Sequence, residues 1–381
     1  MAPNLKEEKP LVLLFGYDSS PFTNKVRLAL RVKGIPFSYI PVPSMLPRPL
    51  LTSTFGVTYR KIPILAIGRE IYCDTSLIIE ALEHYFPVEE GYGSVYPKFE
   101  GGALDEWSYK GLVRGFASFW TDRPFFRATT GLIPSSVWSS PFGTDRSQLI
   151  GHTLDASKLE SKIPQNLATF DLHLSLLEPT FTCHSTSKAS ADGKAKSPWL
   201  IPTPTPSLAD ISLYYQLRWG IDIASGKGIY NLTGGATSNT AHDITSSVFN
   251  AHRYPGIWTW FHAFEAYTSS LPDLETVVQE GDVSWKEKLK GTPLVEEGRM
   301  LVPAAVGWHE ELDKRRGVGR GVRVAIAPDD TGRDNPTVGT VVGLGVEEVV
   351  IVPEGKGEID VRVHFPRLGF VVRVVEGGAK L

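Results

Sequence analysis

The spacing of apolar side chains predicts alternating strands and helices over the first part of the chain. Residues 11–17 form an almost continuous apolar run, which is typical of a short buried strand. Over residues 23–34 the apolar side chains fall at mostly helical spacing, and Gly34 closes that pattern. Residues 36–42 predict a second strand, and the proline-rich residues 43–56 predict irregular or only briefly helical structure.

Three further elements complete this amino-terminal region. Residues 61–73 predict two short strands around Gly68 and Arg69, and residues 74–86 predict an amphipathic helix that begins with polar caps. The order is therefore strand, helix, strand, and then strand, strand, helix. That order is typical of a thioredoxin-like domain, to which we assign residues 1–90.

Helical spacing dominates the middle of the chain, which we assign to an all-helical domain at residues 91–285. Strong helical patterns occupy residues 103–120, 207–223 and 257–271. In the first of these patterns, four apolar residues recur at intervals that place them on one helix face. They are Tyr109, Val113, Phe116 and Trp120.

Two local features refine this helical region. Ser207 and Asp210 have the spacing of a capping box at the start of the second helix, and a structural role explains them fully. Residues 186–206 are rich in small, charged and proline residues, so we expect an exposed excursion with a disordered composition.

Valine-rich segments replace the helical pattern after about residue 290. Residues 321–328, 337–353 and 358–377 partly alternate apolar with polar positions and are punctuated by Gly and Pro. We assign residues 286–381 to a small antiparallel β domain. The basic residues 313–323 could bind an anion, but we favour a solvated turn, because their glycines lack the Lys-Ser/Thr of a phosphate loop.

Composition narrows the classes of partner. The 381 residues suffice for two or three domains, and the formal charge of -3 gives no reason to expect nucleic acid or an anionic membrane. No apolar run approaches the roughly 20 residues that cross a bilayer, and the first ten residues contain no signal-peptide hydrophobic region. We therefore expect a cytoplasmic protein.

The two cysteines exclude two kinds of stabilising site. Cys73 and Cys183 are far apart and match neither a disulfide framework nor a metal-ligand spacing, so we expect no metal. Asn231, with Leu232 and Thr233, fits a glycosylation sequon. Without a secretory route, that sequon is an ordinary loop.

Candidate chemistry gathers where the predicted strands end. Ser20 suits the N-cap of the first helix, and capping alone is the commoner role of such a serine. However, Pro63 starts an apolar strand, where a cis peptide would expose the backbone of Ile62 to an extended ligand. Asp74 and Thr75 start the next helix and can meet the charged groups of a ligand. We expect these elements to converge on one edge of the sheet.

These motifs together resemble a known family. Residues 19–37, 61–65 and 72–87 are similar to the amino-terminal domain of cytosolic glutathione transferases, especially classes with Ser-Pro-Phe or Cys-Pro-Phe at the first helix. Residues 206–213 and 254–261 resemble the matching helical domain. The resemblance covers roughly the first three quarters of the chain, and the ordinary two-domain family lacks the carboxy-terminal β region.

The resemblance implies roles for the residues that match the family motifs. Ser20 would hydrogen-bond and activate the sulfur of glutathione, and Phe22 would pack beneath the site. Lys61 and Ile62 match the residues before the cis-proline, Pro63, with the Ile62 backbone pairing to the cysteinyl part of glutathione. A solvated charge for Lys61 and a turn-shaping role for Pro63 stay open.

The next helix would hold the other end of glutathione. Asp74 and Thr75 stand where the family usually has Glu-Ser, and the resemblance implies that they bind the γ-glutamyl end. The Asp side chain is one methylene shorter than Glu.

The energetics of such a site are adequate. A free thiol titrates near about 8.5, and lowering its pKa by about two units requires about 2.7 kcal/mol. A hydrogen bond to a charged group contributes about 1.5 to 3 kcal/mol, and a helix amino terminus about 0.3 to 2 kcal/mol. Ser in place of Cys favours thiolate addition over disulfide exchange. The rival partners of the thiol are Tyr17, Ser19, Thr23 and Asn24.

We expect a second, hydrophobic substrate where the helical domain faces the same edge. Trp107, Phe116 and Trp120 are candidate aromatic walls, and Arg114 is a candidate for stabilising developing negative charge. Core packing is the commoner role for the aromatic residues, and a solvated charge is the alternative for Arg114.

The sequence thus predicts a glutathione-dependent transferase that adds the thiolate to a hydrophobic electrophile, or uses it for isomerisation or elimination, in detoxification or secondary metabolism. The alternative is a non-catalytic ligand-binding or regulatory protein of the same fold. The resemblance also implies a homodimer, and a third hypothesis has the β region bind a protein partner.

Overall fold

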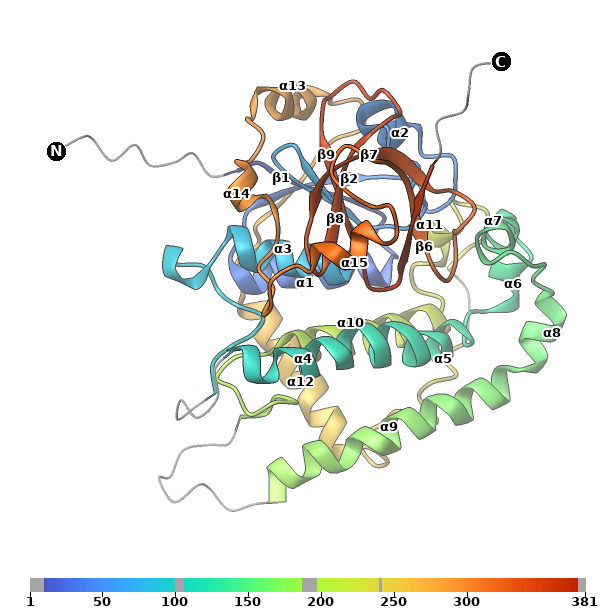
Figure 1. Cartoon of the computed structure of the whole chain (residues 1–381). Helices are drawn as coiled ribbons and strands as arrows, with labels where there is room; N and C mark the ends of the chain where they lie inside the picture. The colour runs from blue at the N-terminus through green and yellow to red at the C-terminus, as the bar shows by residue number, and fades with distance from the viewer. Residues whose placement is uncertain (1–9, 100–105, 187–196, 240–241, 376–381) are drawn as a thin grey trace.

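One sheet runs through the molecule and joins segments from both halves of the sequence (Figure 1). The computed structural model describes residues 10–99, 106–186, 197–239 and 242–375. Within this part of the chain the sheet has ten strands in the order β10-β6-β7-β8-β9-β4-β3-β1-β2-β5.

The amino-terminal region is the expected thioredoxin-like unit. Its elements are β1 (Val12–Gly16), α1 (Pro21–Lys33), β2 (Phe37–Pro41), α2 (Pro49–Phe55), β3 (Ile64–Ile67), β4 (Glu70–Cys73), α3 (Thr75–Tyr85) and the short 3-10 helix η1 (Val88–Glu90). Strand β1 pairs parallel to β2 and antiparallel to β3. Helix α1 ends at Gly34, whose φ of 72° suits a residue without a Cβ. The elements predicted from the sequence are confirmed.

The helical region follows and lies on the side of the sheet that α1 and α3 cover (Figure 1). Its elements are α4 (Glu106–Gly115), the π-helix η2 (Phe116–Phe125), α5 (Phe126–Thr130), α6 (Ser135–Trp138), α7 (Pro141–Ile150), α8 (Ala156–Ser161), α9 (Ile163–Thr186), α10 (Leu208–Ala224), α11 (Ile229–Leu232) and α12 (Pro255–Ser270).

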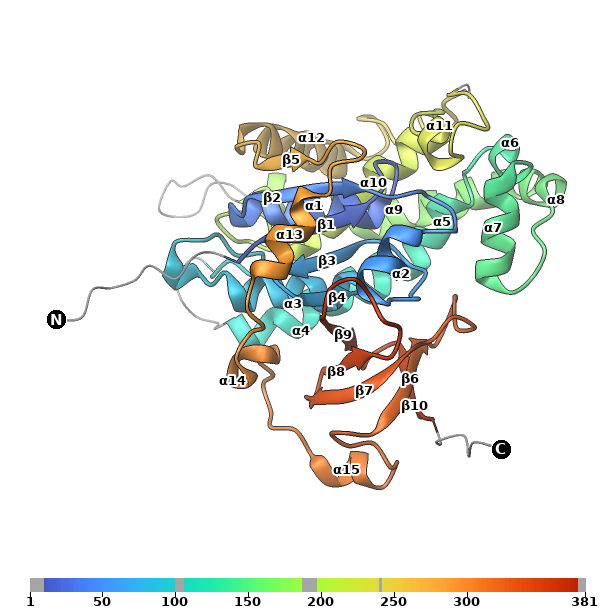
Figure 2. The same cartoon turned by 90° about the horizontal axis from the view of Figure 1, so that it is seen from above.

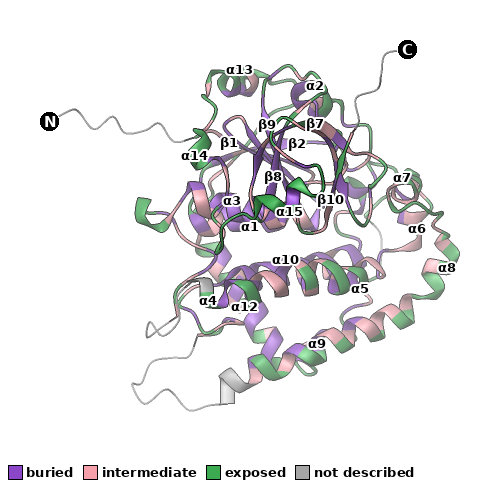
Figure 3. Cartoon of the chain, viewed as in Figure 1, coloured by how far each residue is buried: buried purple, intermediate pink, exposed green. Residues whose placement is uncertain are grey.

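Helix α10 is the centre of that region, and Figure 3 shows it largely buried, whereas α9 is exposed along much of its length. Asp210 Oδ2 accepts hydrogen bonds from the N–H and the hydroxyl of Ser207 at 2.9 and 2.8 Å, which confirms the structural role of this pair. The predicted excursion at 186–206 falls partly on residues 187–196, which lie outside the described residues.

The carboxy-terminal region contains the expected antiparallel strands. Its elements are β5 (Glu275–Val277), α13 (Ser284–Gly291), α14 (Glu297–Met300), α15 (Glu310–Lys314), β6 (Arg323–Pro328), β7 (Thr337–Leu344), β8 (Glu348–Pro353), β9 (Arg362–Pro366) and β10 (Phe370–Val374). Strand β9 pairs parallel to β4, with Tyr72 opposite His364, so these strands extend the thioredoxin-like sheet (Figure 2). At the other edge, β5 pairs parallel to β2.

The alternation of side chains along β1 divides the core into two layers. Val12 and Leu14 pack with α1, α3 and the helical region, whereas Leu13 and Phe15 face α2, α13 and the carboxy-terminal strands. The carboxy-terminal region therefore shares a hydrophobic core with the amino-terminal one. The three-way domain division made from the sequence stays a prediction.

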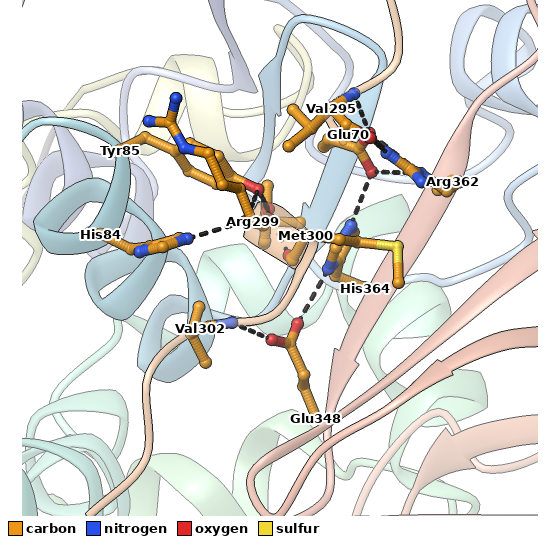
Figure 4. A network of polar contacts seen from close by, with 11 residues as sticks. Glu70, His84, Tyr85, Val295, Arg299, Met300, Val302, Glu348, Arg362 and His364 are labelled. Carbon is orange, nitrogen blue, oxygen red and sulfur yellow. Dashed lines mark hydrogen bonds and ion pairs between the residues drawn. The ribbon is translucent and has the colours of Figure 1, made fainter. Parts of the chain in front are cut away.

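A buried ionic network joins the two regions where β4 meets β9 (Figure 4). It consists of Glu70, Glu348, Arg362 and His364, all of which are buried. His364 Nδ1 lies 2.8 Å from Glu348, and its Nε2 lies 2.8 Å from Glu70. Because ionised carboxylates only accept hydrogen bonds, this arrangement favours a proton on both ring nitrogens. Burial opposes this charge, but the two carboxylates hold the pKa of His364 above its usual value.

Candidate functional site

The strand register brings the predicted polar elements to one edge of the sheet. Ile64 of β3 stands opposite Phe15 of β1 and also opposite Cys73 of β4. The chain leaving β1, the chain entering β3 and the chain leaving β4 therefore meet at the same edge. We call residues 17–20, 60–63 and 74–76 the polar edge. The convergence expected from the sequence is confirmed.

Ser20 caps the first helix through its hydroxyl oxygen, and its hydroxyl hydrogen is not used in that bond. Its Oγ accepts a hydrogen bond from the Thr23 N–H at 3.2 Å, as an N-cap does. Within the described chain, the Ser20 hydroxyl donates no hydrogen bond. The side chain is almost fully buried, at the positive end of the helix dipole. Ser20 can therefore cap α1 and still donate to an anion, so its capping and binding roles are compatible.

The neighbouring candidates are more constrained. The backbone N–H and the hydroxyl of Ser19 both donate to Asn231 Oδ1, at 2.9 and 2.8 Å. Tyr17 Oη accepts a long hydrogen bond from Arg146 at 3.4 Å, and Asn24 donates to the Asp18 carbonyl at 3.0 Å. These bonds give Ser19 and Asn24 structural partners, and contact of Tyr17, Ser19 or Asn24 with a thiol stays a prediction.

Thr23 is the remaining rival. Its Oγ1 is buried and has no hydrogen-bond partner in the described part of the chain. A Cβ at Gly16 would collide with this side chain, so Thr23 lies tightly against the end of β1.

The peptide bond before Pro63 has the expected cis form, and Phe22 packs in an aromatic cluster. The peptide bond between Ile62 and Pro63 is cis. Within the described residues, neither the N–H nor the C=O of Ile62 takes part in a hydrogen bond, so both are open to an extended ligand. The Phe22 ring packs against Phe126 and Tyr215, with ring centroids 5.0 and 6.1 Å apart.

Asp74 has an unusual backbone conformation. Its φ of 72° is the only positive φ of a non-glycine residue in the described chain, and such strain clusters at functional sites. Oδ1 accepts hydrogen bonds from the N–H and the hydroxyl of Ser76, at 3.0 and 2.6 Å. Oδ2 has no hydrogen-bond partner among the described residues, so the carboxylate can still meet a ligand ammonium group. Thr75 beside it is buried.

Lys61 lies at the other end of the edge, together with charged residues that the sequence did not single out. Lys61 Nζ lies 2.5 Å from Asp330 Oδ1, in the loop between β6 and β7. Arg60 and Arg146 both pair with one carboxylate, Asp145 of α7. No local pattern predicts the contacts of Lys61 and Arg60, because their partners lie 269 and 85 positions away in the sequence.

Asn231 is a further residue that the sequence presented differently. It fits a glycosylation sequon, and we interpreted it as a loop residue. The loop interpretation is wrong, because Asn231 lies in helix α11, and its carboxamide accepts hydrogen bonds from Ser19 in the turn before Ser20.

The predicted second-substrate residues lie in other surroundings. Arg114 binds Glu347 through two hydrogen bonds of 3.0 and 2.6 Å. Phe116 stacks on Trp120, whose ring also contacts His173 of α9. These contacts favour packing and ion pairing over a substrate wall at the polar edge. The side chain of Trp107 lies outside what the structure describes, and a substrate role for these residues stays a prediction.

Other chemistries find little support in the described residues. Within them, no group of three or more His, Cys, Asp or Glu side chains is arranged to hold a metal ion. Burial raises the pKa of the Cys73 thiol well above its usual value, which makes Cys73 a packing residue. In the same part of the chain, no helix is both long and apolar enough to span a bilayer.

The fold and the polar edge define a class of protein: a thioredoxin-like domain with a cis-proline, followed by a helical region. The profile of the glutathione S-transferase N-terminal domain matches residues 14–90. Residues 14–90 therefore match this domain family, and the chain resembles a GST-like protein in fold, with a carboxy-terminal β region after the helical one.

Two curated relatives and one solved structure illustrate the similarity. Glutathione S-transferase U4 of Arabidopsis thaliana is 32% identical over 79 residues, which cover 21% of this chain and 35% of the relative. Glutathione S-transferase U1 of the same plant is 25% identical over 119 residues, covering 29% and 53%. The chain thus spans about a third to a half of the length of these relatives.

The solved structure extends the fold comparison to almost the whole chain. A GST-like protein from Pseudomonas syringae superposes with a TM-score of 0.60 at 23% identity, covering 96% of this chain and 100% of its own. Its similarity concerns the fold alone. The coverage includes the carboxy-terminal β region, so that region has a structural counterpart.

Proposed function

We propose that this chain binds glutathione at the polar edge and activates its thiol for addition to a hydrophobic electrophile. The observation that carries the proposal is the Ser20 hydroxyl, which keeps a free donor at the start of α1. A thiolate placed there gains a charge-assisted hydrogen bond and the favourable end of the helix dipole.

The remaining groups of the edge fit the rest of the tripeptide. The unpaired N–H and C=O of Ile62 suit an extended peptide that pairs like an added strand. Asp74 offers a free carboxylate oxygen to the α-ammonium group of the γ-glutamyl end, and Thr75 starts α3, where a carboxylate is favoured. Phe22 supports the site by packing beneath it.

The net reaction is conjugation, isomerisation or elimination, all of which begin from the same activated thiolate. The related names support glutathione chemistry in general. A non-catalytic ligand-binding protein is the second candidate, favoured by the engagement of Lys61 with Asp330. The homodimer and the cytoplasmic location implied by the sequence stay predictions.

The test combines binding with turnover. We expect calorimetry to detect glutathione binding below millimolar concentration, and model electrophiles to be conjugated. Ser20→Ala removes a hydrogen bond to a charged group, so we expect kcat/KM to fall about 10- to 150-fold.

Ser140→Ala is the matched control, because Ser140 caps α7 by accepting from the Phe142 N–H at 3.2 Å. Both variants lose a helix cap worth about 1 kcal/mol, but only Ser20 would contact the thiol. The proposal fails if the wild-type protein does not bind glutathione up to millimolar concentration. Equal activity of Ser20→Ala and Ser140→Ala would remove Ser20 from the mechanism.

A further inference from the structure

The carboxy-terminal β region supplies a charged residue to the polar edge. Asp330 lies in the loop at 329–336 and forms an ion pair with Lys61 at 2.5 Å. Both side chains are partly exposed, Lys61 by 26% and Asp330 by 49%. Burial opposes ionisation of Asp330, but the neighbouring ammonium group holds its pKa below the usual value.

The loop that carries Asp330 is anchored on several sides. The Asp329 N–H donates to the Gly369 carbonyl at 2.9 Å, and the Gly332 N–H donates to the Leu149 carbonyl at the end of α7, also at 2.9 Å. The Thr58 hydroxyl donates to the Pro336 carbonyl at 2.8 Å. The backbone of the loop is therefore held against the residues that precede Pro63, and Asp330 is kept beside Lys61.

Lys61 forms its ion pair with Asp330, whereas the neighbouring cations Arg60 and Arg146 pair with Asp145. Its neighbour Arg60 pairs with Asp145 at 3.1 Å, and Arg146 shares the same carboxylate. Lys61 has Asp330 as its carboxylate partner. An anionic group of a ligand that approaches Lys61 would therefore meet a site already neutralised by the protein's own carboxylate.

Glutathione presents such an anionic group. With its γ-glutamyl end at Asp74 and its cysteinyl part at Ile62, the end that remains for Lys61 is the glycyl carboxylate. Two carboxylates beside one ammonium group repel each other. The protein would have to release Asp330, or share Lys61, when the tripeptide binds.

We propose that Asp330 is an intramolecular competitor for the glycyl carboxylate of glutathione at Lys61, by which the carboxy-terminal β region lowers the affinity of the site. This inference rests on the proposed function. It assigns the β region a role in binding that does not require a separate partner.

The experiment measures the Kd for glutathione by calorimetry at low ionic strength. We expect Asp330→Asn to bind glutathione roughly 1.5- to 5-fold more tightly than wild type, the range set by the strength of an exposed ion pair. Asp334→Asn is the matched control, because Asp334 is an exposed carboxylate in the same loop. It should bind like wild type.

A second probe separates charge from loop movement. Glutathione ethyl ester has its glycyl carboxylate blocked, so we expect Asp330→Asn and wild type to bind it equally. If Asp330→Asn binds the ester more tightly as well, the effect is not competition between carboxylates, and the inference is wrong.

The remaining outcomes distinguish the two proposals. If wild type binds glutathione and Asp330→Asn binds it equally or more weakly, the inference falls while the proposed function stands. If neither protein binds glutathione, both the proposed function and the inference that rests on it are wrong. Detectable binding by Asp330→Asn alone would support both.

Discussion

Among the described residues, two of the ionic contacts between the carboxy-terminal β region and the amino-terminal domain differ in burial. The side chains of Glu70 and His364 in the buried ionic network have no exposed surface, whereas those of Lys61 and Asp330 are 26% and 49% exposed. The chemistry is the same in both places: a carboxylate faces a cation. Only the exposed pair is accessible to a carboxylate in solution, so the difference in burial distinguishes a purely structural contact from the proposed binding contact.

The buried ionic network also holds the segment that leads into the β region. The Val302 N–H donates to Glu348, the Val295 N–H donates to Glu70 at 3.1 Å, and Arg362 donates to the Val295 carbonyl at 2.5 Å (Figure 4). Strand pairing, the connecting segment and the charges are therefore coupled. At the Lys61 contact, the Asp330 carboxylate receives a backbone hydrogen bond from Thr331, and both side chains of the pair remain partly exposed.

The largest effect should come from breaking the buried ionic network. His364→Ala leaves Glu70 and Glu348 without the cation between them, and we expect the free energy of unfolding to fall by about 3–5 kcal/mol. Urea denaturation followed by circular dichroism measures this change. Glu354→Gln is the control, because it breaks the half-exposed pair with Arg323 and should cost about 1 kcal/mol or less. An equal decrease in the free energy of unfolding of both variants would contradict the proposed difference between buried and exposed ion pairs.

The pH dependence of stability should separate the two contacts. The raised pKa of His364 means that its contribution is complete below about 6.5, its usual pKa, and is lost as pH rises toward the higher folded value. Between these limits we expect wild type to lose about 1.4 kcal/mol per pH unit relative to His364→Ala. The groups around the imidazole are Glu70, Glu348, Arg362 and the stacked ring of Tyr72.

The contribution of the Lys61–Asp330 ion pair to stability should change with pH in the acid range. The lowered pKa of Asp330 means that its contribution is present above about 3.9 and is lost as pH falls through the lower folded value. Glu70, whose pKa is also lowered, adds an acid-side loss to the buried network. Denaturation midpoints measured from acid to alkaline pH test these directions. Parallel profiles of wild type and His364→Ala near neutrality would show that His364 is not charged.

The smallest of these effects should lie at a third contact, between Arg114 and Glu347. Their side chains are 28% and 24% exposed, and the pair has two hydrogen bonds, so its burial is intermediate. We expect a double-mutant cycle with Arg114→Ala and Glu347→Ala to give a coupling free energy of about 1 kcal/mol. Turnover of model electrophiles by Arg114→Ala provides a second measurement. A drop in kcat without loss of stability would restore the substrate role that the sequence suggested.

Local sequence patterns predicted most of the helices and strands of the fold and part of the candidate site. The apolar run before Ser20 and the stop at Gly34 predict β1 and α1 to within about two residues. The resemblance of the motif around Pro63 to the family implies the cis peptide bond, which the structure contains. These features depend on neighbours along the chain, which the sequence presents directly.

Local sequence patterns did not predict the contacts between residues that are far apart in the sequence. Glu70 and His364 look like ordinary strand-end or solvated positions, and only the pairing of β4 with β9 buries them together. The π-helical turn from Phe116 to Phe125 also escapes a pattern search, because its apolar side chains keep nearly α-helical spacing. Asp330 belongs to a loop whose partner lies 269 positions earlier.

The parallel pairing of β4 with β9 has a consequence for synthesis on the ribosome. Glu70 and Arg362 are 292 positions apart, so at ordinary translation rates the nascent β4 waits roughly 15–60 s for its neighbour. During that interval β4 is an unprotected edge, and a carboxylate on an edge strand discourages pairing with other polypeptides. We expect the charge of Glu70 to reduce aggregation of the growing chain until Arg362 and His364 have been synthesised and neutralise that charge.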